Sequence, residues 1–205
     1  ALAIRYAVDN GARVINMSFG KPVSPYKQFV DDAVRYAQSK GVLLVHGSGN
    51  DGKDITQDVF YPNPVFLDGT RASNYITVGA SGDESSGGYA ASFSNYSSKW
   101  VDIFAPGMNI YSTATDNRYL SADGTSLASP VVTGVAALLR SYFPDLSPQQ
   151  VIQIIDSSGT RLDADVACPG DEQKKIPFST LSASGRIINA YGAVKLALEM
   201  EKKKS

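Results

Sequence analysis

Residues 124–130 read Gly124-Thr125-Ser126-Leu127-Ala128-Ser129-Pro130 and run directly into an apolar segment over residues 131–139. Gly124 permits a tight turn, and the small and apolar residues that follow predict a buried helix. Ser126 then lies at the start of that helix, where backbone N–H groups have no partner inside the helix. Pro130 fits a position in the first turn, where a missing N–H is tolerated. The free N–H groups and the positive end of the helix dipole favour negative charge beside Ser126.

This environment suits attack of a serine oxygen on a carbonyl group, because backbone donors can meet the oxyanion that forms. The apolar run alone indicates only a core helix that has a serine in its first turn. The whole heptapeptide, however, resembles the nucleophile motif of the subtilisin-like serine proteases, Gly-Thr-Ser-x-Ala-Ser-Pro. The resemblance implies that Ser126 is the nucleophile. Val131 departs from the family pattern, because many members have a histidine there, but that histidine is not the catalytic base.

Two further segments resemble the family in the same order along the chain. Residues 14–20 resemble the strand that lies beside bound substrate, and residues 45–52 resemble the segment that carries the oxyanion-hole asparagine, here Asn50. A simple turn residue is the alternative for Asn50, because Asn-Asp-Gly is common in turns. Substrate would pair as an added strand with the first segment and place a side chain beside the second. The predicted substrate-binding residues are Ser18, Phe19, Gly20, Gly47, Ser48 and Gly49.

The sequence indicates less clearly which substrate side chain fits the pocket beside residues 47–49. The small residues at 47–49 leave room, which favours a large apolar residue before the scissile bond. Asp51 at the rim favours a basic residue instead. Phe60, just before the Tyr61-Pro62 turn, would narrow the pocket.

A serine nucleophile needs a general base, and the base needs an orienting group. The chain contains one histidine, His46, at the end of a predicted buried strand over residues 41–45. The family does not use this position for the base, so we interpret His46 as a packed or partly exposed strand residue, with a catalytic role as the alternative. The Asp-x-Gly and His-Gly-Thr segments of the family do not occur in the chain. In the subtilisin order of Asp, His and Ser, the strands that carry Asp and His are expected to precede Ala1, and residues 1–205 alone are expected to be inactive.

Short apolar stretches alternate with helical patterns along the chain. This alternation predicts an α/β fold with three layers, in which helices cover a largely parallel sheet that is incomplete at its N-terminal side. A capping box over residues 147–150 starts one helix, and Asn189 caps the last one. Residues 160–180 show no regular pattern. Residues 1–205 are therefore predicted to form the C-terminal portion of a single subtilisin-like domain.

Composition narrows the choice of partners. The formal net charge of −1 gives no indication of a nucleic acid or an anionic membrane as a partner, and no apolar run is long enough to span a bilayer. Cys168 is the one cysteine, so it is either a free thiol or paired outside the chain. Asp163 and Asp165 form a loop carboxylate pair that we interpret as solvated. The chemistry requires no cofactor and no metal ligand is predicted, while the resemblance implies a secreted or cell-envelope protein and allows structural calcium in the complete domain.

The sequence thus predicts a serine endopeptidase that hydrolyses peptide bonds through an acyl-enzyme on Ser126. A pseudoprotease or binding scaffold with the same fold is the alternative. A lipase-like hydrolase fits less well, because Gly-x-Ser-x-Gly and a downstream histidine are both absent. The expected partners are a polypeptide substrate and either the segment that bears Asp and His or a second copy of the chain.

Overall fold

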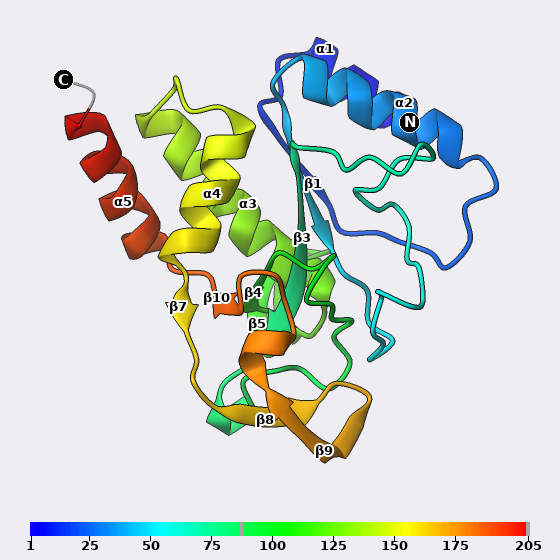
Figure 1. The fold of residues 1–205 in the computed structure, drawn as a ribbon, viewed down its shortest axis with the longest axis vertical. Helices are drawn as coiled ribbons and strands as arrows, with labels where there is room; N and C mark the ends of the chain where they lie inside the picture. Colours follow the sequence, from blue (N-terminus) through cyan, green and yellow to red (C-terminus); the bar gives the residue numbers. More distant parts are fainter. Residues whose placement is uncertain (87, 204–205) are drawn as a thin grey trace.

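The computed structural model describes residues 1–86 and 88–203, which are built around one six-stranded sheet (Figure 1). In spatial order the strands are β1 (Val14–Met17), β2 (Leu43–Gly47), β3 (Tyr75–Ser81), β4 (Ile103–Pro106), β10 (Arg186–Ile187) and β7 (Thr160–Arg161). Neighbouring strands are parallel except for β10 and β7. All residues of β2 and β3 are buried, as expected for parallel strands with both faces covered. The prediction of a largely parallel α/β sheet is confirmed.

Helices cover both faces of this sheet. The long helix α3 (Thr125–Tyr142) packs with α4 (Pro148–Ser158) and α5 (Ala190–Lys202) in one apolar cluster that includes Leu43. The helices α1 (Leu2–Asp9) and α2 (Lys27–Ser39) share a second cluster with Leu44. Adjacent residues of a strand point to opposite faces, so the two clusters lie on opposite sides of the sheet. This arrangement is the predicted three-layer architecture.

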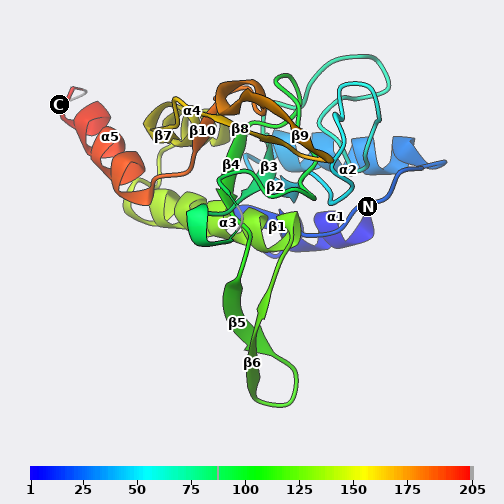
Figure 2. The ribbon, with the colours of Figure 1, turned by 90° about the horizontal axis from the view of Figure 1, so that it is seen from below.

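A hairpin projects from the body of the molecule (Figure 2). Its strands β5 (Ile110–Ala114) and β6 (Arg118–Ala122) are antiparallel, and β6 leads into the turn before α3. Tyr111 and Tyr119 stack across the hairpin with their ring centroids 5.7 Å apart, although the two residues are 71% and 60% exposed. At its base, Asn109 N donates to Asp123 Oδ1 at 2.6 Å, which closes the hairpin beside the turn that precedes Ser126.

The structure corrects the expectation that residues 160–180 are irregular, and it confirms the two predicted helix caps. Residues 160–180, where the sequence shows no pattern, contain β7, a second hairpin of β8 (Asp165–Cys168) and β9 (Asp171–Pro177), and the short helix η2 (Phe178–Thr180). β9 is exposed at almost every position, so it lacks the apolar alternation that reveals a strand. The capping box at Ser147 and the cap at Asn189 form as predicted.

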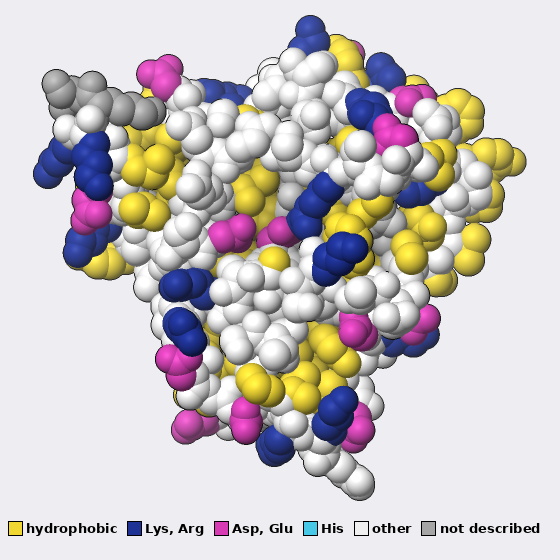
Figure 3. All heavy atoms as spheres, viewed as in Figure 1, with side chains coloured by type: hydrophobic (Ala, Val, Ile, Leu, Met, Phe, Trp, Pro, Cys, Tyr) yellow, Lys and Arg dark blue, Asp and Glu magenta, His cyan; other side chains and the backbone are white. Residues whose placement is uncertain are grey.

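The surface agrees with the near-zero net charge. On the face shown in Figure 3, acidic and basic side chains are interspersed and neither sign forms a broad patch. Among the residues that the structure describes, including the short helix η1 (Glu84–Ser86), no helix combines the length and apolar character needed to cross a membrane.

Candidate active site

Ser126 is the second residue of α3, two positions after Gly124, the glycine that precedes the helix. Gly124 has φ of 151°, a value that L side chains rarely adopt, and its N–H donates to Gly107 O at 2.8 Å. Its carbonyl accepts the first helical hydrogen bonds from Leu127 N and Ala128 N. The Ser126 backbone N–H therefore belongs to the first turn, where the helix offers it no carbonyl partner.

Pro130 lies inside α3 and not in its first turn, so that prediction is wrong. Because proline has no N–H, the carbonyl of Ser126, four residues earlier, has no helical donor. Ser18 Oγ takes this place and donates to Ser126 O at 2.8 Å. Ser18 Oγ also accepts from Asn16 Nδ2 at 2.8 Å and lies 3.0 Å from Ser129 Oγ. The segment after β1 is thereby bonded to the first turns of α3.

Asn50 is oriented by the residue before the predicted nucleophile. Its Oδ1 accepts from both Thr125 N and Thr125 Oγ1, each at 2.9 Å. Thr125 Oγ1 in turn accepts from Gly49 N at 3.1 Å. Because the carbonyl end of the Asn50 amide is held by Thr125, the direction of its NH₂ end is set; a Cβ placed on Gly124 would lie 3.5 Å from Asn50 Nδ2.

One cavity of about 240 Å³ brings most of the predicted site residues together. Its lining is Ser18, Phe19, Gly20, Gly47, Gly49, Asn50, Phe60, Thr125 and Ser126. Ser48 does not line it, because its buried hydroxyl donates to Asn95 O at 2.8 Å and its side chain faces another cavity. Thr125 was not singled out from the sequence, where its only signal is its place in the motif beside Ser126.

His46 is a packed residue of β2, as interpreted from the sequence. It is 2% exposed, and its Nε2–H donates to Phe19 O at 2.8 Å. Burial lowers the pKa of His46 to about 4, so the ring is neutral at pH 7. His46 lines a different cavity from Ser126, whose Oγ donates to Ser18 O at 3.4 Å.

The remaining candidate groups stand apart from this cavity. Asp163 is exposed and pairs with Arg161 at 2.6 Å, and Cys168 is a buried free thiol whose Sγ lies 3.4 Å from the Tyr96 hydroxyl. Within residues 1–86 and 88–203, no three His, Cys, Asp or Glu side chains are grouped closely enough to hold a metal ion.

The site combines three features on a largely parallel sheet: a serine at the N-terminus of a buried helix, an oriented amide, and a strand segment beside them. Together they make up a serine-hydrolase type of site. The family model of the subtilases matches residues 1–186, and the chain belongs to that family.

Relatives with known activities agree with this assignment. The chain is 39% identical over 162 residues to a thermostable alkaline protease of Halalkalibacterium halodurans, with 79% of this chain and 40% of the relative covered. It is 45% identical over 139 residues to a thermophilic serine proteinase of a Bacillus species, with 68% and 31% covered. It is 40% identical over 162 residues to subtilisin DY of Bacillus licheniformis, with 78% and 54% covered. The chain thus spans between about a third and about half of the length of these relatives.

Solved structures show the same fold. The prenylagaramide maturation protease PagA superposes with a TM-score of 0.73 at 28% identity, over 95% of this chain and 65% of the other. A cold-adapted subtilisin-like serine proteinase superposes with a TM-score of 0.64 at 32% identity, over 78% and 54%.

Proposed function

We propose that residues 1–205 supply the nucleophile and the oxyanion hole of a serine endopeptidase. The observation that carries this proposal is the Asn50 amide, held by two hydrogen bonds to Thr125 and lining the same cavity as Ser126. A turn asparagine would not need to be bonded to the nucleophile helix 75 positions further along the chain.

In this proposal Ser126 Oγ attacks the carbonyl carbon of a peptide bond while its proton passes to the general base. The oxyanion that forms accepts from Asn50 Nδ2 and from the Ser126 backbone N–H. The C–N bond then breaks, the base returns the proton to the leaving amine, and an ester on Ser126 remains. Water hydrolyses this ester by the same steps, which releases the acid and restores the serine.

The general base and its orienting carboxylate come, in this proposal, from outside these residues: either a preceding segment or a companion chain. His46 is unsuited to the role because it is buried, because its lowered pKa of about 4 makes it a weak base, and because its ring N–H is bonded to Phe19 O. β1 is the edge strand of the sheet, and a further strand can pair with such an edge. A secreted or cell-envelope location, which the family resemblance implies, is part of the same proposal.

The experiment uses the polypeptide in which residues 1–205 are joined to, or mixed with, the segment that bears Asp and His. Ser126→Ala is expected to abolish cleavage of peptide amides. Asn50→Ala is expected to lower kcat about 10²- to 10³-fold, the established loss for an oxyanion-hole asparagine of a subtilisin, with little change in KM. Asn10→Ala, at the exposed end of α1, is the matched control and leaves both constants unchanged. A raised KM with unchanged kcat in Asn50→Ala would make Asn50 a ground-state contact instead.

A binding module that does not cleave its peptide is the second candidate. The observation in its favour is that the one histidine of the sequence is buried away from Ser126. Residues 1–205 alone are expected to bind peptides without hydrolysing them. Hydrolysis by the isolated chain that disappears in Ser126→Ala would reveal a base inside it, whereas a longer polypeptide that binds and never cleaves would favour the scaffold.

A further inference from the structure

The cavity beside Ser126 ends at the ring of Phe60. Gly20 and Gly49 lie on the two backbone segments that flank this cavity, and Phe60 contacts both. A Cβ on Gly20 would overlap Cε1 and Cζ of Phe60, and a Cβ on Gly49 would lie 3.0 and 3.1 Å from the same two atoms. The space between the Gly20 segment and the Gly49 segment, called the slot below, is where a substrate side chain would enter. The ring of Phe60 therefore fills this slot.

A larger cavity lies on the other side of this ring. It measures about 420 Å³, and Phe60 is the one residue that lines both it and the cavity beside Ser126, among the parts of the chain that the structure describes. Its wall is largely apolar, with Ile55, Val59 and Trp100 among its members. His46 also contributes, as a neutral ring whose centroid is 6.2 Å from that of Phe60.

The loop that carries Phe60 is fastened at several points. Directly after Phe60, Tyr61 exchanges two backbone hydrogen bonds of 2.9 Å with Lys21, the neighbour of Gly20. Further along the loop, Lys27 Nζ donates to Val65 O at 2.6 Å and pairs with Asp31 at 2.5 Å.

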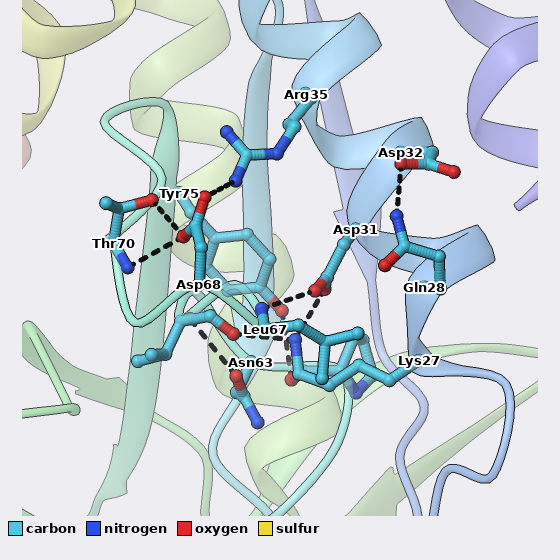
Figure 4. A network of polar contacts seen from close by, with 12 residues as sticks. Lys27, Gln28, Asp31, Asp32, Arg35, Asn63, Leu67, Asp68, Thr70 and Tyr75 are labelled. Carbon is cyan, nitrogen blue, oxygen red and sulfur yellow. Dashed lines mark hydrogen bonds and ion pairs between the residues drawn. The ribbon is translucent and has the colours of Figure 1, made fainter.

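Asp31 and Tyr75 complete this attachment of the loop to α2 and β3 (Figure 4). Asp31 Oδ2 accepts from Leu67 N at 2.9 Å, and the Tyr75 hydroxyl donates to Pro62 O at 3.1 Å. Because Pro62, Val65 and Leu67 also line the inner cavity, these contacts hold the loop that carries Phe60 along the wall of that cavity.

We infer that Phe60 determines which residue can precede the scissile bond. The ring limits that residue to a small side chain such as alanine, and it separates the slot from an inner cavity that accepts a large apolar side chain once the ring is removed. The inference rests on the proposed roles of Ser126 and Asn50, and it replaces the large apolar residue expected from the glycines alone.

The first test uses the cleavage-competent longer polypeptide and two peptide amides that differ only in alanine or phenylalanine before the scissile bond. The wild type is expected to favour alanine in kcat/KM by about 10- to 200-fold, the range that small differences of fit in an apolar pocket produce. Phe60→Ala is expected to reverse the preference by raising kcat/KM for phenylalanine. Val59→Ala alters only the inner cavity and keeps the wild-type preference. A wild type that favours phenylalanine, or a Phe60→Ala variant with unchanged preference, would overturn the inference.

The second test does not need catalysis. Residues 1–205 carrying Ser126→Ala are titrated, with NMR detection, with acetyl-Ala-Ala-Ala and acetyl-Ala-Ala-Phe, which mimic cleavage products. The first peptide is expected to bind more tightly, and the order is expected to reverse when Phe60→Ala is added. If circular dichroism shows that this variant does not fold, Phe60→Leu replaces it, with a smaller shift in the same direction. Absence of cleavage of any peptide would contradict the proposed function, while equal binding of both peptides in both variants would contradict the role of Phe60.

Discussion

Ser18 Oγ donates to the backbone oxygen of Ser126 at 2.8 Å, across 108 positions of sequence. This bond takes the place of the helical hydrogen bond that Pro130 cannot make. The Ser18 hydroxyl therefore helps to join the segment expected to bind substrate to the turn that presents Ser126, and a change at Ser18 is expected to affect both.

Ser18→Ala is expected to lower the free energy of unfolding by about 1–3 kcal/mol, because the partly buried Ser126 carbonyl is left without a donor. Urea denaturation of the wild type and the variant measures this loss. Pro130→Ala restores an N–H four residues after Ser126, so the double variant is expected to lose less stability than the two single losses added together. Strictly additive changes in the free energy of unfolding would show that the Ser18 hydroxyl and the N–H restored at position 130 do not donate to the same carbonyl.

Gly47→Ala is expected to be destabilising because β2 lies close to the start of α3. A Cβ on Gly47 would be 2.8 Å from Thr125 O and 3.0 Å from Thr125 C, and backbone atoms cannot move aside as a flexible side chain would. The expected loss is about 1–3 kcal/mol in urea denaturation. Gly134→Ala is the control, because a Cβ there meets nothing within 4 Å on the exposed side of α3. That control is expected to gain up to about 1 kcal/mol from helix propensity, and equal tolerance of the two changes would contradict the close approach.

His46 is expected to make stability rise with pH in the mildly acidic range. Its pKa is lowered from 6.5 to about 4 by burial, so between these values the unfolded chain binds a proton that the folded chain does not. Stability is then lost as the pH falls from about 6.5 toward 4, by up to about 3 kcal/mol. Urea denaturation at a series of pH values measures the slope. In His46→Gln the slope in this window is expected to be shallower, and a wild-type slope that persists in the variant would assign it to other groups.

Asp156 in α4 is expected to have the opposite effect, so that its contribution makes stability fall as the pH rises. Its Oδ1 is buried without a hydrogen-bond partner among the described residues, and burial, followed by the nearby charge of Asp102, raises its pKa from 3.8 to about 8. The folded chain therefore holds a proton that the unfolded chain releases, so this contribution to stability is present below about pH 4 and is lost as the pH rises to about 8. In Asp156→Asn the difference in unfolding free energy between pH 5 and pH 8 is expected to favour pH 8 more than in the wild type. An unchanged difference would show that Asp156 is already ionised at pH 5.

Most of the layer architecture could be predicted from the sequence because its signals are strong and repeated. The buried strands β2 and β3 are rich in apolar residues, and the motif around Ser126 places a tight turn before a long apolar helix. β9 could not be predicted, since an exposed polar strand has no apolar pattern to reveal it. The orientation of Ser48 could not be predicted either, because its position in the sequence does not say which face of the strand end packs against Asn95.

Three local features follow from residues close together in the chain: the turn at Gly124, the capping box at Ser147 and the cap at Asn189. The order of strands and helices follows from the alternation of apolar stretches and helical patterns along the chain. Three other features depend on contacts that exist only in the folded chain. Ser18 replaces the donor that Pro130 lacks, His46 is buried away from Ser126, and Phe60 fills the space between Gly20 and Gly49. The physical reason is that local hydrogen bonding and apolar periodicity act between near neighbours in the chain. Contacts between segments far apart in sequence exist only after burial of the two apolar faces of the sheet has fixed how strands, helices and loops meet.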